Sequence, residues 1–148
     1  LNESILALRK GAVDALRIPA SENELVSQAK VSKFMQTKLA KRMGEAQLRN
    51  QLHKEQPFMM AVKGNSVRPN FPEDEDVLIQ GVIDVYFEES DGLVLLDYKT
   101  DSVSDSNELV KRYEAQLVYY AEALERLTHK KVKEKLIYSF ALHEVISL

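Results

Sequence analysis

The sequence contains no cysteine among its 148 residues, which excludes disulfides and any zinc or iron–sulfur site with thiolate ligands. It also lacks a secretory signal pattern, a glycine-rich phosphate loop and any apolar run near the roughly 20 residues that a membrane-spanning helix needs. The net charge of −3 gives no general basic field, so any affinity for nucleic acid must be local. We therefore expect a single globular domain in a cytoplasmic setting.

The most informative stretch consists of two apolar, β-branched runs, residues 77–87 and 93–99, which flank a short acidic segment. This pattern predicts a β-hairpin. A two-residue loop would place Asp84 opposite Lys99, whereas a four-residue loop would place it opposite Asp97. Because side chains alternate between the faces of a strand, both registers put these three charged residues on the same face.

Two carboxylates that lie close together repel each other unless a cation sits between them. Mg²⁺ takes oxygen ligands and supplies such a cation, and a neighbouring lysine then orients a water nucleophile or stabilises charge on a phosphate. The same spacing also fits a hairpin with an ordinary surface salt bridge, so the spacing alone leaves both interpretations open. Gly81, three residues before Asp84, allows a close approach of the backbone.

Helical periodicity predicts a long helix over about residues 106–127, after the hairpin. Gln116 and Tyr120 lie one turn apart on a face beside its apolar stripe, either at the boundary of the core or at a functional site. Lys111 and Arg112 on the same helix are candidates for phosphate contacts. The stripe itself indicates core packing and consists of Leu109, Tyr113, Leu117, Ala121 and Leu124.

The other elements are predicted from apolar periodicity and from breaks at proline, glycine and polar clusters. Asp105 and Glu108 form a capping box for the long helix. We expect helices over about 3–17, 21–29 and 32–44, a strand within 48–62, a turn at 64–66, a loop over 68–76, and a final strand over 136–142 that continues toward 148. This order predicts a mixed α/β layer with the long helix against the sheet.

Three weaker candidates precede the hairpin. Segment 30–54 carries seven lysine or arginine residues against Glu45 alone, which fits either a solvated helix face or a flank that contacts phosphates. Glu55 is either an exposed strand residue or a further acidic group that reaches the metal site. His53 is expected to be a surface residue.

Three motifs in this order resemble the PD-(D/E)xK nuclease family in its RecB form: Gly81-Val82-Ile83-Asp84, then Asp97-Tyr98-Lys99-Thr100, then Gln116 with Tyr120. The set of three is specific, whereas each part alone would be weak. The flanking segments 55–58 and 136–140 are most similar to the C-terminal nuclease domains of AddA-type (RexA-type) helicase–nuclease subunits. The resemblance implies an α/β fold with a restriction-endonuclease-like core, in which helices flank a mixed β-sheet.

The resemblance also implies roles for the motif residues. Mg²⁺, with the use of a second ion left open, would be bound by three groups: the carboxylates of Asp84 and Asp97 and the backbone carbonyl of Tyr98. Lys99 would orient the attacking water or stabilise it. Gln116 and Tyr120 would position the DNA strand and the catalytic groups.

The function implied by the resemblance is that of a metal-dependent DNA exonuclease, which hydrolyses phosphodiesters of unwound single-stranded DNA. The expected setting is an ATP-driven helicase–nuclease that processes double-strand breaks for homologous recombination. Its motor would lie upstream on the same polypeptide, and an AddB-type (RexB-type) subunit would be the partner. The competing hypotheses are a non-catalytic DNA-binding or scaffolding module with the same fold, and a metal-independent protein–protein domain.

The sequence departs from the family at one ligand. In the family, a histidine on a helix at the start of the nuclease domain completes the metal site, and no histidine stands at a suitable place before the hairpin. The first residue is Leu1 rather than methionine, so we expect 1–148 to be a single nuclease domain fragment whose first helix lies upstream. Such a fragment is expected to bind metal weakly or to be inactive alone.

Overall fold

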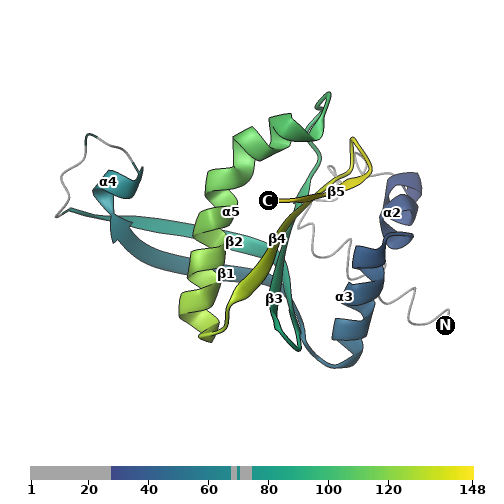
Figure 1. Cartoon of the computed structure of the whole chain (residues 1–148), viewed down its shortest axis with the longest axis horizontal. Coiled ribbons are helices and arrows are strands. Elements are labelled where there is room, and N and C mark those ends of the chain that lie inside the picture. The colour runs from purple at the N-terminus through teal and green to yellow at the C-terminus, as the bar shows by residue number, and fades with distance from the viewer. Residues whose placement is uncertain (1–27, 68–69, 71–74) are drawn as a thin grey trace.

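The computed structural model describes residues 28–67, 70 and 75–148 (Figure 1). Three expected elements lie wholly or mostly outside these residues: the helix over 3–17, the helix over 21–29 and the loop over 68–76.

A five-stranded mixed sheet forms the centre of the molecule, and its strands follow one another in space in chain order. The strands are β1 (Leu52–Lys63), β2 (Asp76–Glu89), β3 (Gly92–Lys99), β4 (Val132–Ser139) and β5 (Glu144–Ser147). Neighbouring strands are antiparallel except β3 and β4, which are parallel and therefore need a crossover connection. Helix α5 (Ser106–Thr128) supplies that crossover. The predicted α/β fold with a mixed sheet between helices is confirmed.

Helices cover both faces of the sheet. On one face, α2 (Gln28–Met35) and α3 (Lys38–Leu48) bury apolar side chains against β2, β3 and β4, among them Phe34, Met43, Phe87, Val94 and Tyr138. On the other face, α5 packs against the same strands through Leu109, Leu117, Ala121 and Leu124, as its apolar stripe predicted. The central strands are therefore buried on both sides, which explains why their sequences are almost continuously apolar.

The β2–β3 hairpin turns at Ser90 and Asp91, and its regular pairing runs from Glu89 with Gly92 to Val85 with Leu96. One step further, the same register sets Asp84 across from Asp97. This is the second of the two registers that the sequence allowed.

Side-chain alternation shifts by one position at Asp84. Ile83 and Tyr86 both pack in the core on the α5 side, although regular alternation would point residues three apart to opposite faces. On the neighbouring strand, Glu55 has a φ of 54°, in the left-handed region, and the regular pairing of β1 with β2 skips it. Beyond this irregularity β1 and β2 extend as a long arm past α5 toward the short helix α4 (Gly64–Val67), as Figure 1 shows. Asp84 thus stands where the arm joins the sheet.

The single helix expected over 32–44 is two helices, because the chain breaks at Thr37. The Thr37 hydroxyl accepts a hydrogen bond from Ala40 N at 3.1 Å and donates one to Phe34 O at 2.7 Å, so it caps α3 and closes α2 at once. The expected break just before this helix is also wrong, since α2 runs through it. Helix α3 continues to Leu48, which delays β1 to Leu52.

The strand expected over 136–142 ends earlier, at Ser139, and a separate strand follows. The Ser139 hydroxyl accepts a hydrogen bond from Leu142 N at 3.0 Å, and His143 adopts a φ of 55°. The chain therefore turns back, and β5 pairs antiparallel with β4. The expected turn at 64–66 is the helical turn α4.

Helix α5 begins and ends close to its predicted bounds. Asp105 is its N-cap and accepts a hydrogen bond from Glu108 N at 3.1 Å, as the capping pattern predicted. His129 ends the helix in the left-handed conformation. Within the described part of the chain, no helix is both long and apolar enough to cross a membrane.

Candidate active site

Two aspartates face each other where the β1–β2 arm joins the sheet. The Asp97 side chain on β3 is almost fully buried, with 4% of the residue exposed. Asp84 on β2 is partly buried, and its Oδ2 accepts a hydrogen bond from Tyr98 N at 3.0 Å. Burial, together with the neighbouring Asp97 carboxylate, raises the pKa of Asp84 from 3.8 to about 8. The site thus concentrates negative charge away from water.

A single ammonium group lies beside this pair. Lys99 Nζ lies 2.8 Å from Asp97 Oδ2 and donates a hydrogen bond to Gln116 Oε1 at 3.2 Å. Its third neighbour is the ring of Tyr113, whose centroid lies 3.8 Å from Nζ. Only 16% of the Lys99 side chain is exposed, so protein groups replace most of its hydration.

The predicted pair on α5 continues this network. Gln116 Nε2 donates a hydrogen bond to Tyr120 OH at 3.1 Å, and the Tyr120 ring packs edge-on against Phe58 on β1. Gly81 leaves the room for this packing, since a Cβ there would lie 3.0 Å from Phe58 Cε1 and 3.3 Å from Tyr120 Cε1. Contacts therefore run without a gap from β1, across α5, to the lysine.

The donor set fits a divalent cation. Asp97 Oδ2 is buried and accepts no hydrogen bond of acceptable geometry, despite its 2.8 Å contact with Lys99. One lysine also cannot neutralise two facing carboxylates, and hard cations prefer such oxygens. The N–H and C=O of a strand residue point to the same edge, so the Tyr98 carbonyl faces the same side as the N–H that binds Asp84. Two carboxylates and this carbonyl are the groups able to hold the ion.

No further acidic or histidine side chain joins the two aspartates among residues 28–67, 70 and 75–148. Glu55 lies on the strand beside Asp84 but is exposed, and the structure does not bring it into the site. His53 is exposed and stacks on Tyr86, with ring centroids 4.7 Å apart. The structure therefore offers two carboxylates rather than three.

The helix residues considered for phosphate contacts differ in their environment. Arg112 Nη1 donates to Asp101 Oδ2 at 3.1 Å and its guanidinium also lies within 4.0 Å of Glu108, so acidic partners already occupy it. Lys111 is exposed. Only the lysine thus keeps its charge available to a phosphate without breaking a contact seen here.

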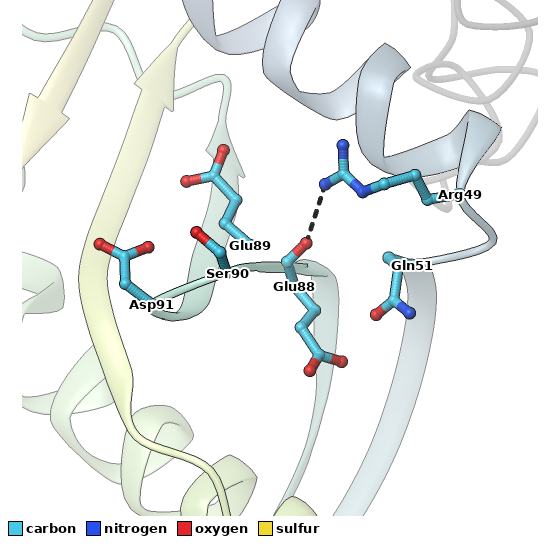
Figure 2. Close-up of a pocket in the computed structure, with 6 residues that line it drawn as sticks. All are labelled: Arg49, Gln51, Glu88, Glu89, Ser90 and Asp91. Atoms are coloured by element: carbon cyan, nitrogen blue, oxygen red, sulfur yellow. Dashed lines mark hydrogen bonds between the residues drawn. The ribbon is translucent and has the colours of Figure 1, made fainter.

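Two arginines of the basic segment are engaged at the turn end of the hairpin, away from the aspartates. Arg42 binds Glu89 with two hydrogen bonds, of 3.0 and 2.7 Å, and also contacts Glu134. Arg49 donates to Glu88 O at 3.1 Å across a pocket at this turn (Figure 2). The remaining side chains that line this pocket are Gln51, Ser90 and Asp91. The basic segment therefore includes fewer available charges than its sequence indicates.

Sequence reasoning missed a functional pairing between Tyr113 and Asp101. The Tyr113 hydroxyl donates to Asp101 Oδ2 at 2.6 Å. Burial and this hydrogen bond raise the pKa of Tyr113 to about 12. Burial opposes it, yet the hydrogen bonds from Tyr113 and Arg112 hold the pKa of Asp101 below its usual value. The available signal was spacing: Tyr113 lies one helical turn before Gln116, but as a member of the apolar stripe it was assigned to core packing.

Comparison with known proteins gives one family and a consistent set of relatives. Residues 4–145 match the PD-(D/E)XK nuclease superfamily. The chain is 42% identical over 135 residues to an ATP-dependent helicase/nuclease subunit of Clostridium botulinum (strain Kyoto / Type A2), covering 88% of this chain and 10% of that protein. It is 39% identical over 135 residues to the protein of the same name from Clostridium kluyveri, covering 88% of this chain and 11% of that protein. The chain thus spans about a tenth of these relatives, and it belongs to the PD-(D/E)XK nuclease superfamily.

Proposed function

We propose that the chain is a Mg²⁺-dependent deoxyribonuclease domain that hydrolyses phosphodiesters of single-stranded DNA. The observation that carries this proposal is the pair of facing carboxylates, Asp84 and Asp97, of which one buried oxygen lacks a hydrogen bond beside the Lys99 ammonium. Family membership supports a nuclease, and nucleases of this superfamily generally use divalent metal ions. The choice of Mg²⁺, with one ion or two, is part of the proposal.

Asp84, Asp97 and the Tyr98 carbonyl would hold the ion. When bound, a divalent cation lowers the pKa of a coordinated water and stabilises the charge that develops on a phosphate. The residues of the chain supply the rest. The aspartates fix the position of the charge, and the Tyr98 N–H orients the Asp84 carboxylate from behind. This arrangement forms in the fold before substrate binds, which is the preorganisation that electrostatic catalysis requires.

Lys99 is the group that meets the reacting phosphate or the attacking water. Its ammonium lies between Asp97 and Gln116, which leaves its charge fixed beside the carboxylates rather than free in solvent. Gln116 and Tyr120 would set the position of the DNA strand relative to this charge, because they form the adjoining surface of α5. Fixed positive charge next to a phosphate typically contributes 10²–10³ in rate, at about the scale of an oxyanion-hole donor.

The wider setting of the proposal comes from the relatives, which are named as parts of an ATP-dependent helicase/nuclease. We propose that the chain acts in the cytoplasm in the same context, as an exonuclease on strands that an upstream motor has unwound. In that setting it would process double-strand breaks for homologous recombination, together with an AddB-type (RexB-type) partner protein. The motor and the partner lie outside this chain.

The test is cleavage of end-labelled single-stranded DNA in Mg²⁺, with EDTA as the metal-free control. The chain and a version extended upstream are each compared with their Asp97→Asn variants. We expect cleavage that EDTA abolishes and that Asp97→Asn slows by about 10²–10³. Asp76→Asn, an exposed aspartate at the far end of β2, is the matched control and should cleave normally. If neither length cleaves DNA and Asp97→Asn binds it equally well, the chain is a non-catalytic module.

A further inference from the structure

Tyr113 contacts the Lys99 ammonium from a direction that neither oxygen partner covers. The three contacts of Nζ come from three sources: Asp97 Oδ2 on its own strand, Gln116 Oε1 on α5, and the ring face of Tyr113 one turn earlier on α5. An ammonium has three N–H groups, and the face of an aromatic ring attracts a cation through its quadrupole. The lysine is thus enclosed by two oxygens and one ring.

The ring is itself held in place at its far end. The Tyr113 hydroxyl donates to Asp101 Oδ2 at 2.6 Å, and Arg112 donates to the same oxygen at 3.1 Å. Asp101 lies two residues after Lys99, just past the end of β3. This clamp ties the end of the strand that carries the lysine to the helix that carries its partners.

We infer that Tyr113 is a positioning residue for Lys99, which holds the ammonium against Asp97 and Gln116 through the face of its ring. A free lysine side chain samples many rotamers, and the ring removes those that swing the ammonium away from the carboxylates. The inference rests on the proposed nuclease function for its effect on rate, but the ring–ammonium contact itself is independent of that function. A tyrosine that only fills the core would leave the lysine unchanged when replaced by another apolar side chain.

Two substitutions separate these roles. Tyr113→Phe keeps the ring face and loses the hydroxyl, whereas Tyr113→Leu keeps an apolar side chain and loses the ring. The matched control is Tyr119→Leu, which removes a half-buried ring from the same helix, where it packs against a different cluster. Thermal unfolding of all variants reports any general loss of stability.

The first readout does not depend on nuclease activity. The metal-free chain is acetylated with an amine-reactive ester, and peptide mass spectrometry gives the labelling rate of Lys99 relative to the exposed Lys111. We expect Tyr113→Leu to speed labelling of Lys99 about tenfold, Tyr113→Phe to change it less than about twofold, and Tyr119→Leu to leave it unchanged. Equal labelling of Lys99 in the wild-type chain and in Tyr113→Leu would overturn the inference.

The second readout is the steady-state cleavage of single-stranded DNA in Mg²⁺. Tyr113→Leu should lower kcat about 30-fold, which corresponds to about 2 kcal/mol, with little change in KM, and Tyr113→Phe should restore most of the rate. A kcat loss in Tyr113→Leu no larger than in Tyr119→Leu would contradict the positioning role while leaving the nuclease intact. If labelling of Lys99 rises as expected but the wild-type chain cleaves nothing, the positioning contact stands and the proposed function fails.

Discussion

Replacing Asp84 with asparagine tests the electrostatic tension between the two facing aspartates. Without metal, the raised pKa of Asp84, about 8 against 3.8, means that the folded chain at pH 7 carries a proton that the unfolded chain lacks. Binding that proton costs about 4 kcal/mol at full effect, and screening at a partly exposed carboxyl reduces this to about 2 kcal/mol. Asparagine is neutral in both states and can still accept the hydrogen bond from Tyr98 N. The metal-free variant should therefore be more stable than the wild-type chain.

The assay is thermal unfolding in EDTA at several pH values. A gain of about 2 kcal/mol should raise Tm by about 4–8 °C at pH 7. The sign follows from linkage: an acid whose pKa is raised on folding loses stability as pH rises, so the gain from Asp84→Asn should be small near pH 4 and grow up to about pH 8. The exposed Asp76→Asn should change stability by less than about 0.5 kcal/mol. Equal or lower stability of Asp84→Asn in EDTA would refute the reasoning.

Adding Mg²⁺ should reverse the order of the two proteins. An ion that binds only the folded state stabilises it by mass action, and the wild-type chain alone keeps both carboxylates. We expect Tm of the wild-type chain to rise with Mg²⁺ concentration and that of Asp84→Asn to stay nearly constant. Parallel rises in both proteins would show that the ion binds elsewhere.

Three further outcomes follow from other parts of the structure. Tyr138→Phe should raise the free energy of unfolding by about 1 kcal/mol in urea titrations, because its hydroxyl is buried and has no hydrogen-bond partner in the described part of the chain; a loss of stability would contradict this. Glu89→Gln should cost about 1 kcal/mol at pH 7, because Arg42 lowers the pKa of Glu89 from 4.5 to about 2, and the difference from wild type should vanish as pH falls from 4.5 toward 2; a constant difference would point to another cause. Gly81→Ala should slow DNA cleavage and lower Tm, because the new Cβ would lie 3.0 Å from Phe58 Cε1, and normal rates would show that the ring shifts freely.

The sequence was sufficient to predict the charged face of the hairpin. Alternation along two apolar strands places Asp84, Asp97 and Lys99 together for either even loop length, and the structure has one of these registers. The helix that carries Gln116 was predictable for a similar reason, since a capping residue and a long apolar stripe determine both its start and its buried face. Period and capping are local signals, so they survive without knowledge of the fold.

Features that depend on contacts between elements were not predictable. No glycine or proline marks the irregularity at Glu55, where the arm joins the sheet, so the sequence gives no reason to expect its positive φ. Thr37 interrupts an amphipathic pattern that continues on both sides, and its role as a cap appears only when its hydroxyl bonds are seen. The ring of Tyr113 reaches Lys99 only because α5 docks on this face of the sheet. In each case tertiary packing decided between local alternatives of similar energy.

The central claim is that one divalent cation binds between the two facing aspartates. The most direct measurement is anomalous scattering from crystals of the chain soaked in Mn²⁺, which takes oxygen ligands like Mg²⁺. We expect a peak at about 2.0–2.4 Å from a carboxylate oxygen of Asp84 and from one of Asp97, with Lys99 beside it. Saturating Mn²⁺ that leaves this position without a peak, or a peak that touches only one of the two carboxylates, would contradict the account.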